Sequence, residues 1–246
     1  MGNFGIVWRA ECLEGQHTGQ MVAIKILDTA QFEDSTIQEF RKESAIMNTS
    51  RHQNIVSEHI SFMSGNYLWI VMKLVDAGSC LDIMQILKAQ TRESGIRDEA
   101  VIATILKETM NGLQYLHTND KIHRDVKAGN ILMDLNGEVL LTDFGVSASM
   151  KKGQKNNTVC GSPCWMAPEV MQSLGHDTSA DIWSLGITAI ELALGEAPLS
   201  QYPHMKVIRL ILDQSPPTLP SSGWTDEFKS FVNACLQKEP TDRPSI

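Results

Sequence analysis

Two short acidic motifs are the strongest chemical signal in this chain. The first is segment 123–132, His-Arg-Asp-Val-Lys-Ala-Gly-Asn-Ile-Leu, and the second is Asp143-Phe144-Gly145. They supply a carboxylate to orient a hydroxyl, a lysine near a migrating phosphate, and an amide with a second carboxylate for magnesium. Either motif alone could arise by chance. The two together, in this order, indicate phosphoryl transfer.

Two further motifs flank this pair. Lys25 ends the segment Val22-Ala23-Ile24-Lys25, and Ala167-Pro168-Glu169 follows downstream. With all four motifs in order, the chain resembles a eukaryotic protein kinase. The resemblance implies an α+β, two-lobed protein kinase fold, with a small β-sheet lobe that contains one helix and a larger, mainly helical lobe.

The expected domain organisation is one protein kinase domain over residues 1–246. Its small lobe would cover residues 1–72, the hinge 73–78 and the large lobe 79–246. Against the family pattern the domain is expected to be truncated at both ends. The first glycine of the phosphate loop would precede Met1, and the last helix of the fold would follow the final residue.

Hydrophobic patterns predict individual elements. Apolar runs rich in β-branched and aromatic residues predict strands at 22–27 and 67–72. Helical spacing predicts one helix over 36–47 and another that begins after Asp98, a suitable N-cap. Further expected elements are two helices near 180–194 and 224–237, with the turn-rich segment 214–217 between them.

Composition indicates a soluble globular protein. The 246 residues are 42% hydrophobic and 20% charged, and the net charge of −8 argues against a nucleic-acid partner. No stretch of about 18 uninterrupted apolar residues predicts membrane insertion. The five cysteines have no zinc-type spacing, which favours reduced thiols and a cytoplasmic location.

The kinase resemblance assigns the catalytic roles and implies ATP and Mg²⁺ as cofactors. Asp125 would accept or orient the substrate hydroxyl, and Lys127 would steady the γ-phosphate. Asn130 and Asp143 would hold magnesium. The spacing from Lys127 to Asn130 is the serine/threonine version of the loop, so the expected enzyme is a serine/threonine protein kinase.

Lys25 is expected to contact the α- and β-phosphates and to pair with a helix glutamate. Glu43 fits the family pattern best, and Glu39 is the alternative. Met72 would be the gatekeeper, and the backbones of Lys73 and Val75 would offer hydrogen bonds to adenine. The complete ATP-binding set expected from the resemblance is Gly2, Asn3, Gly5, Val7, Ala23, Lys25, Met72, Lys73, Val75 and Leu132.

Control of the activity is expected in the activation segment, residues 143–169. Arg124 carries a charge beside Asp125 that needs a partner, and a phosphate on Thr158 would supply it. Lysines in the middle of the segment (Lys151, Lys152 and Lys155) could assist or simply be solvated.

Other positions in the family pattern are expected to bind substrate or to support the fold. Ser162 would contact Asp125 and Lys127 through its hydroxyl, and Val146 would favour threonine over serine as the acceptor. Glu169 and Arg243 would form a buried ion pair. Asp181 would hold the backbone of the catalytic loop.

Sequence details narrow the resemblance to the germinal-centre-kinase branch. The segments that carry it are 68–73, 158–169, 186–192 and 202–207. The most similar group is the Fray-like kinases, the oxidative-stress-responsive and proline-alanine-rich kinases. This implies stress, osmotic or ion-cotransport signalling, with protein substrates such as cation-chloride cotransporters and an upstream activating kinase as partners. The alternative is a truncated, inactive kinase-like scaffold.

Glu58 departs from the family pattern. It stands where kinases place an apolar residue of an internal stack whose other members would be Met47, His123 and Phe144. A carboxylate buried there without a partner would be costly. Either the register differs locally by one residue, or the small lobe is loosely organised.

Overall fold

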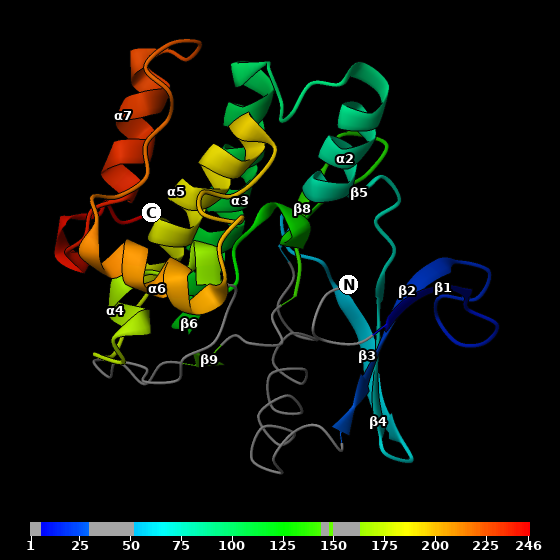
Figure 1. Ribbon diagram of the computed structural model, residues 1–246. Helices are drawn as coiled ribbons and strands as arrows, with labels where there is room; N and C mark the ends of the chain where they lie inside the picture. The colour runs from blue at the N-terminus through cyan, green and yellow to red at the C-terminus, as the bar shows by residue number, and fades with distance from the viewer. Residues whose placement is uncertain (1–5, 30–51, 144–147, 150–162) are drawn as a thin grey trace. The chain divides into compact units, whose positions relative to one another are not determined.

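The computed structural model describes residues 6–29, 52–143, 148–149 and 163–246 (Figure 1). The chain divides into two compact units, Met1–Asp76 and Ala77–Ile246. The boundary falls inside segment 73–78; that this segment acts as a hinge stays a prediction. The described residues of the first unit form a β-sheet and those of the second are mainly helical, which confirms the α+β class.

The first unit contains a four-stranded antiparallel sheet in the order β1-β2-β4-β3. Its strands are β1 (Ile6–Glu11), β2 (Met21–Asp28), β3 (Glu58–Ser64) and β4 (Tyr67–Lys73). β2 and β4 contain the two predicted strands. Along β2, Ala23, Lys25 and Leu27 are buried while Ile24 and Ile26 are only half-buried, the period of two expected of a strand.

Glu58 begins β3 and is half-buried. The register between β3 and β4 shifts between Glu58 and Ile60, which marks an irregularity in the ladder. The extra residue lets the strand start with a polar side chain without forcing the following apolar residues onto the other face. The place of Glu58 relative to the internal stack stays a prediction, because Met47 and Phe144 lie outside the described residues.

The second unit combines helices with two small sheets, ordered β5-β7-β8 and β6-β9. Its strands are β5 (Gly78–Ser79), β6 (Lys121–Ile122), β7 (Ile131–Met133), β8 (Val139–Leu141) and β9 (Ala148–Ser149). Its α-helices are α2 (Cys80–Thr91), α3 (Glu99–Thr118), α4 (Pro168–Met171), α5 (Ser179–Leu194), α6 (His204–Asp213) and α7 (Asp226–Cys235). Single 3₁₀ turns are η2 (Ala128–Asn130), η4 (Pro163–Trp165) and η5 (Pro240–Asp242).

α5 is the core of this unit, with α3 and α7 packed beside it (Figure 1). Every residue from Ala180 to Ala193 is buried, including Trp183 at 0% exposure. Gly186 allows the close approach of α7, since a Cβ there would lie 2.7 Å from the Cβ of Cys235. None of the helices in the described part of the chain is long and apolar enough to span a membrane.

The predicted N-cap at Asp98 is confirmed, because its carboxylate accepts hydrogen bonds from the amides of Ala100 and Val101. Segment 214–217 lies between the two predicted helices, now α5 and α7, as expected. Two helices, α2 and α6, were not predicted, and α6 ends directly before segment 214–217. The helix predicted over 36–47 lies outside the described residues.

Candidate active site

The segment from β6 through η2 places two polar side chains against the carboxylate of Asp125. Lys127 Nζ donates to Asp125 Oδ2 at 2.6 Å, and Asn130 Nδ2 donates to the same oxygen at 2.9 Å. Asn130 Nδ2 also donates to the backbone carbonyl of Asp125 at 2.7 Å. Asp125 and Asn130 are each 4% exposed, so the aspartate is held in one orientation by neighbours that are themselves fixed.

His123 connects this loop to the segment that carries Asp143. Its Nδ1 accepts a hydrogen bond from the amide of Asp125, so Nε2 carries the proton and donates to the carbonyl of Thr142 at 2.9 Å. Burial lowers the pKa of His123 and outweighs the opposing charges of Asp181, Asp125 and Asp143. His123 is therefore a neutral connector between the two acidic motifs.

Asp143 lies beside Asn130 in this unit. The amide of Thr142 donates to the carbonyl of Asn130 at 2.9 Å, and Ile131 pairs with Leu141 in the adjoining β7–β8 ladder. Arg124 and Asp143 have positive φ angles of 69° and 66°, a conformation that costs energy for residues other than glycine. Such strain is concentrated at functional sites.

The donor chemistry of this pair fits magnesium. Mg²⁺ prefers carboxylate and amide oxygens and is commonly held by one or two protein groups together with phosphates. The amide nitrogen of Asn130 is used by Asp125, which leaves the amide oxygen as its ligand atom. Asp143 offers the carboxylate one residue beyond the Thr142–Asn130 hydrogen bond.

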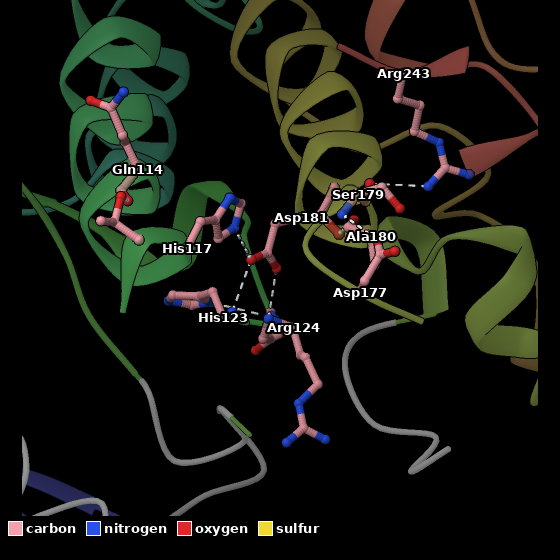
Figure 2. Close-up of polar contacts among 12 residues, drawn as sticks. Gln114, His117, His123, Arg124, Asp177, Ser179, Ala180, Asp181 and Arg243 are labelled. Carbon is pink, nitrogen blue, oxygen red and sulfur yellow. Dashed lines mark hydrogen bonds and ion pairs between the residues drawn. The ribbon is translucent and has the colours of Figure 1, made fainter. Parts of the chain in front are cut away.

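Asp181 at the start of α5 anchors the loop through both of its carboxylate oxygens (Figure 2). Its Oδ1 accepts from the amide of Arg124 at 2.8 Å, and its Oδ2 accepts from the amide of His123 at 2.9 Å and pairs with His117 Nε2 at 2.8 Å. Burial alone would raise the pKa of Asp181, but His117 and His123 outweigh it and lower the pKa. Figure 2 shows the guanidinium of Arg124 pointing away from this carboxylate.

α5 contacts the loop along one polar stripe. Thr188 Oγ1 donates to the carbonyl of Val126 at 3.2 Å, and Glu191 Oε2 accepts from the amide of Ala128 at 2.9 Å. Residues 181, 188 and 191 share a face of the helix, because they recur at helical spacing. A helix that is otherwise apolar thus fixes the loop backbone from residue 123 to residue 128.

Glu169 and Arg243 form a buried, bidentate ion pair with N–O distances of 2.7 and 2.8 Å. The three remaining guanidinium hydrogens donate to the carbonyls of Gln237, Ser179 and Lys238. All five donors of the arginine are therefore used, which is the condition under which a buried ion pair is tolerated.

The first unit places four of the expected ATP-binding residues on one face of its sheet. Val7 lies opposite Lys25, and Ala23 lies opposite Met72, with Ala23 and Lys25 two residues apart on β2. Lys25 is 7% exposed. The amide of Lys73 donates to the carbonyl of Ser57, so the hydrogen bond expected from Lys73 can involve only its carbonyl.

Leu132 and Val75 complete the described members of the set. Leu132 lies in β7 opposite Ser79, and Val75 is 8% exposed. The expected site residues that lie outside the described part of the chain are Gly2, Asn3, Gly5, Glu43, Val146, Thr158 and Ser162. Their roles stay predictions.

Sequence reasoning missed two groups that bond to the site. His117 and Glu191 each lie within a segment predicted to be helical, and neither was assigned a role in the site. The available signal was a carboxylate inside a buried helix, since an acid there must find hydrogen-bond donors. Which donors it finds depends on the tertiary fold.

Comparisons with known proteins show the family of the chain. Residues 1–246 match the family described as protein kinase domain. The chain is similar to serine/threonine-protein kinase fray2 of Dictyostelium discoideum, 47% identical over 99% of this chain and 23% of that protein. Germinal center kinase 3 of Caenorhabditis elegans is 42% identical over 100% of this chain and 44% of its own length.

A relative of more similar length is serine/threonine-protein kinase ppk11 of Schizosaccharomyces pombe. It is 42% identical over 98% of this chain and 74% of its own length. The first curated relatives are longer, and the chain spans between 23% and 44% of the two named above. The match over the whole chain and these identities show that the chain belongs to the protein kinase family, in the germinal-centre-kinase branch of serine/threonine kinases.

Proposed function

We propose that this chain transfers the γ-phosphate of ATP to serine or threonine hydroxyls of proteins. The observation that carries the proposal is the arrangement around Asp125. One carboxylate is oriented by Lys127 and Asn130, and the Asn130 carbonyl accepts from the amide next to Asp143. Phosphoryl transfer needs positioned charges more than covalent chemistry, and this arrangement supplies them.

In this mechanism Asp125 accepts a hydrogen bond from the acceptor hydroxyl and aligns its oxygen with the γ-phosphorus. Lys127, held at 2.6 Å from Asp125, offers its positive charge to the phosphoryl group as negative charge moves. Asn130 and Asp143 hold magnesium, which neutralises phosphate charge when it is bound. Lys25 contacts the α- and β-phosphates and pairs with Glu43.

The ATP-binding role of the remaining residues is part of the same proposal. The glycine-rich segment lets backbone N–H groups approach the phosphates. The apolar side chains contact adenine, with Met72 as gatekeeper and the carbonyl of Lys73 and the backbone of Val75 as hydrogen-bonding groups. The residues assigned to ATP are Gly2, Asn3, Gly5, Val7, Ala23, Met72, Lys73, Val75 and Leu132.

Replacement of Asp125 by asparagine tests the activity. Asp125→Asn keeps the shape of the side chain but removes the charge that orients the hydroxyl, so kcat should fall by about 10²-fold or more. The Kd for Mg-ATP, measured by calorimetry, should stay within about threefold, since Asp125 acts on the hydroxyl. Asp120→Asn is the control, because Asp120 is exposed, has φ 55° and tolerates asparagine.

Two results would contradict the proposal. An Asp125→Asn variant that keeps more than about a tenth of the wild-type rate would remove Asp125 from the chemistry. A wild-type chain that binds Mg-ATP but phosphorylates no protein or peptide would instead indicate a kinase-like scaffold.

We further propose that a phosphate on Thr158 activates the chain by pairing with Arg124. The support is the guanidinium of Arg124, which points away from Asp181 while the backbone of the same residue is held by it (Figure 2). A phosphate is a strong bidentate partner for such a group. After treatment with an activating kinase, the variants Thr158→Ala and Arg124→Gln should have equally low kinase activity. The double variant should have the same activity as either single variant. Equal activity of Thr158→Ala and wild type would place the switch elsewhere.

The substrates that fit this proposal are proteins of a stress, osmotic or ion-cotransport cascade in the cytoplasm, including cation-chloride cotransporters. The support is the similarity to the named kinases of the germinal-centre branch. Ser162 is proposed to bind the substrate segment and Val146 to favour threonine as acceptor. Matched peptides with serine or threonine at the acceptor test the last point, with a ratio of kcat/KM of about 5 to 100 in favour of threonine.

A further inference from the structure

Glu191 joins two parts of the second unit that are far apart in sequence. Its Oε2 accepts from the amide of Ala128 at 2.9 Å and from Trp165 Nε1 at 2.9 Å. These two hydrogen bonds are called the Glu191 bridge. Ala128 directly follows Lys127 in the catalytic loop, whereas Trp165 ends the turn η4 in the activation segment. Glu191 is 2% exposed, so water does not compete for the carboxylate.

Trp165 is held at two points by the same helix. Its backbone carbonyl accepts a hydrogen bond from Ser184 Oγ at 2.8 Å, and Ser184 lies about two helical turns before Glu191 on the same face of α5. A residue fixed at both its backbone and its indole cannot rotate freely. The direction in which η4 leaves Trp165 toward Cys164 and Pro163 is therefore defined by α5.

We infer that Glu191 is a positioning residue that keeps η4 (Pro163–Trp165) in register with Asp125 and thereby sets the KM for protein substrates. The inference rests on the proposed kinase activity. Removal of the Glu191 bridge leaves Asp125 with Lys127 and Asn130, so binding of the peptide suffers more than the chemical step. ATP is bound by other residues and its KM does not change.

The ionisation of Glu191 gives this role a pH signature. Burial raises the pKa of Glu191 to about 7, although the N–H groups of Ala128 and Trp165 and the charge of Lys127 lower it, and Asp125 raises it. Two thiols also face the carboxylate: burial and Glu191 raise the pKa of Cys80 to about 12 and raise that of Cys164, so both are neutral. Ionised Glu191 is the stronger acceptor, and the peptide KM therefore rises as the pH falls through this range.

Steady-state kinetics on the 246-residue chain test the inference, with Mg-ATP and peptide varied in turn across the pH range. Trp165→Phe removes one N–H from a charged acceptor and should raise the peptide KM about tenfold, with kcat changed by less than about threefold. Because the Trp165 hydrogen bond lowers the pKa of Glu191, its loss moves the acidic limb of the profile upward. Glu191→Gln removes that limb. Trp224→Phe, at an edge-to-face contact with Phe228, is the control.

A spectroscopic measurement tests the Glu191 bridge without any turnover. The NMR resonance of the Trp165 indole N–H, assigned by its loss in Trp165→Phe, should titrate near pH 7 in wild type and not in Glu191→Gln. Additive effects of Trp165→Phe and Glu191→Gln on the peptide KM, or an indole that does not titrate, would overturn the inference. An inactive wild-type chain whose indole does titrate would instead overturn the proposed kinase function and, with it, the positioning role.

Discussion

Two acids at opposite ends of α5 hold the same loop and solve the problem of burial differently. Asp181 has donors at both of its oxygens: two backbone amides and His117. Glu191 receives two N–H groups on a single oxygen. The pKa of Asp181 is lowered, whereas that of Glu191 is raised to about 7.

Burial does not explain this difference, since Asp181 is 0% exposed and Glu191 only 2%. The neighbours do. Asp181 accepts hydrogen bonds from the His117 side chain and the His123 backbone, which favour the anion, whereas Glu191 lies near Asp125, whose negative charge opposes ionisation. One end of the loop is therefore anchored by a permanent charge, and the other by a group that changes charge near neutral pH.

Glu169 provides a third solution, since its buried carboxylate is paired with a full cation. The guanidinium of Arg243 also lies over the ring of Trp183, at 5.3 Å from the centroid. This pair joins α4 to the end of the chain and does not touch the catalytic loop. The roles of Asp181, Glu191 and Glu169 can therefore be distinguished by the stability, activity and pH dependence of variants at each site.

The largest effect should come from Asp181→Ala. One buried and two part-buried donors lose their acceptor, and each unsatisfied group costs about 1–3 kcal/mol, so the free energy of unfolding should fall by about 5 kcal/mol. The loop backbone is released at the same time, and kcat should fall by about 10²-fold or more. Urea denaturation and peptide kinetics measure the two effects. Asp226→Ala, at an exposed side chain, should cost less than about 1 kcal/mol.

Arg243→Met should be next, with a loss of about 3–4 kcal/mol in the free energy of unfolding, because Glu169 is left as a buried anion. The double variant with Glu169→Gln should recover part of that loss. The matched control is Arg209→Met in the exposed Arg209–Asp213 pair, which should change stability by less than about 1 kcal/mol. A double variant that is less stable than Arg243→Met would contradict this account of the pair.

Glu191→Gln should reveal the cost of its ionisation. The pKa of Glu191 rises from 4.5 to about 7 on folding, so the stabilising contribution is complete below the lower value and lost as the pH rises through 7. A glutamine at this position does not ionise, so its contribution to stability does not change with pH. Relative to wild type, the variant should gain on the order of 2–3 kcal/mol between about pH 5 and about pH 8. Thermal unfolding across this pH range measures the difference in the free energy of unfolding between Glu191→Gln and wild type, with the exposed Glu196→Gln as control. A difference that does not change with pH would contradict the raised pKa of Glu191.

Much of this site could be predicted from the sequence because its parts are local. The catalytic loop is one continuous segment, so Asp125, Lys127 and Asn130 lie close together wherever the chain folds. β2 and the N-cap at Asp98 were also accessible, since alternation and capping depend on near neighbours. The contacts of Glu191 join residues 63 and 26 positions apart, and no local pattern specifies them.

The missed helices have similar causes. α2 begins with a capping box between Ser79 and Asp82. Because a glycine and a turn precede Ser79, the sequence there indicates a turn, and the capping box is recognised only once the helix is known. α6 begins after Pro203 and buries only Val207 and Ile211, so the charged residues around them masked a short amphipathic helix. In both segments the turn residues at the helix ends masked the helical pattern of the residues between them.

The smallest effect should come from His117, which supplies one of the three donors to Asp181. His117→Leu should lower the free energy of unfolding by about 1.5–2 kcal/mol, the value of one hydrogen bond to a charged group. His117→Gln can place an amide N–H near the same position and should recover at least half of the loss.

Because His117 lowers the pKa of Asp181, its removal should raise that pKa. An aspartate with a lowered pKa stabilises the fold above its unfolded value and loses this contribution as the pH falls, so acid unfolding of His117→Leu should begin at higher pH than in wild type. Circular dichroism during acid titration measures the midpoint, and an unchanged midpoint would show that the two backbone amides alone keep Asp181 ionised.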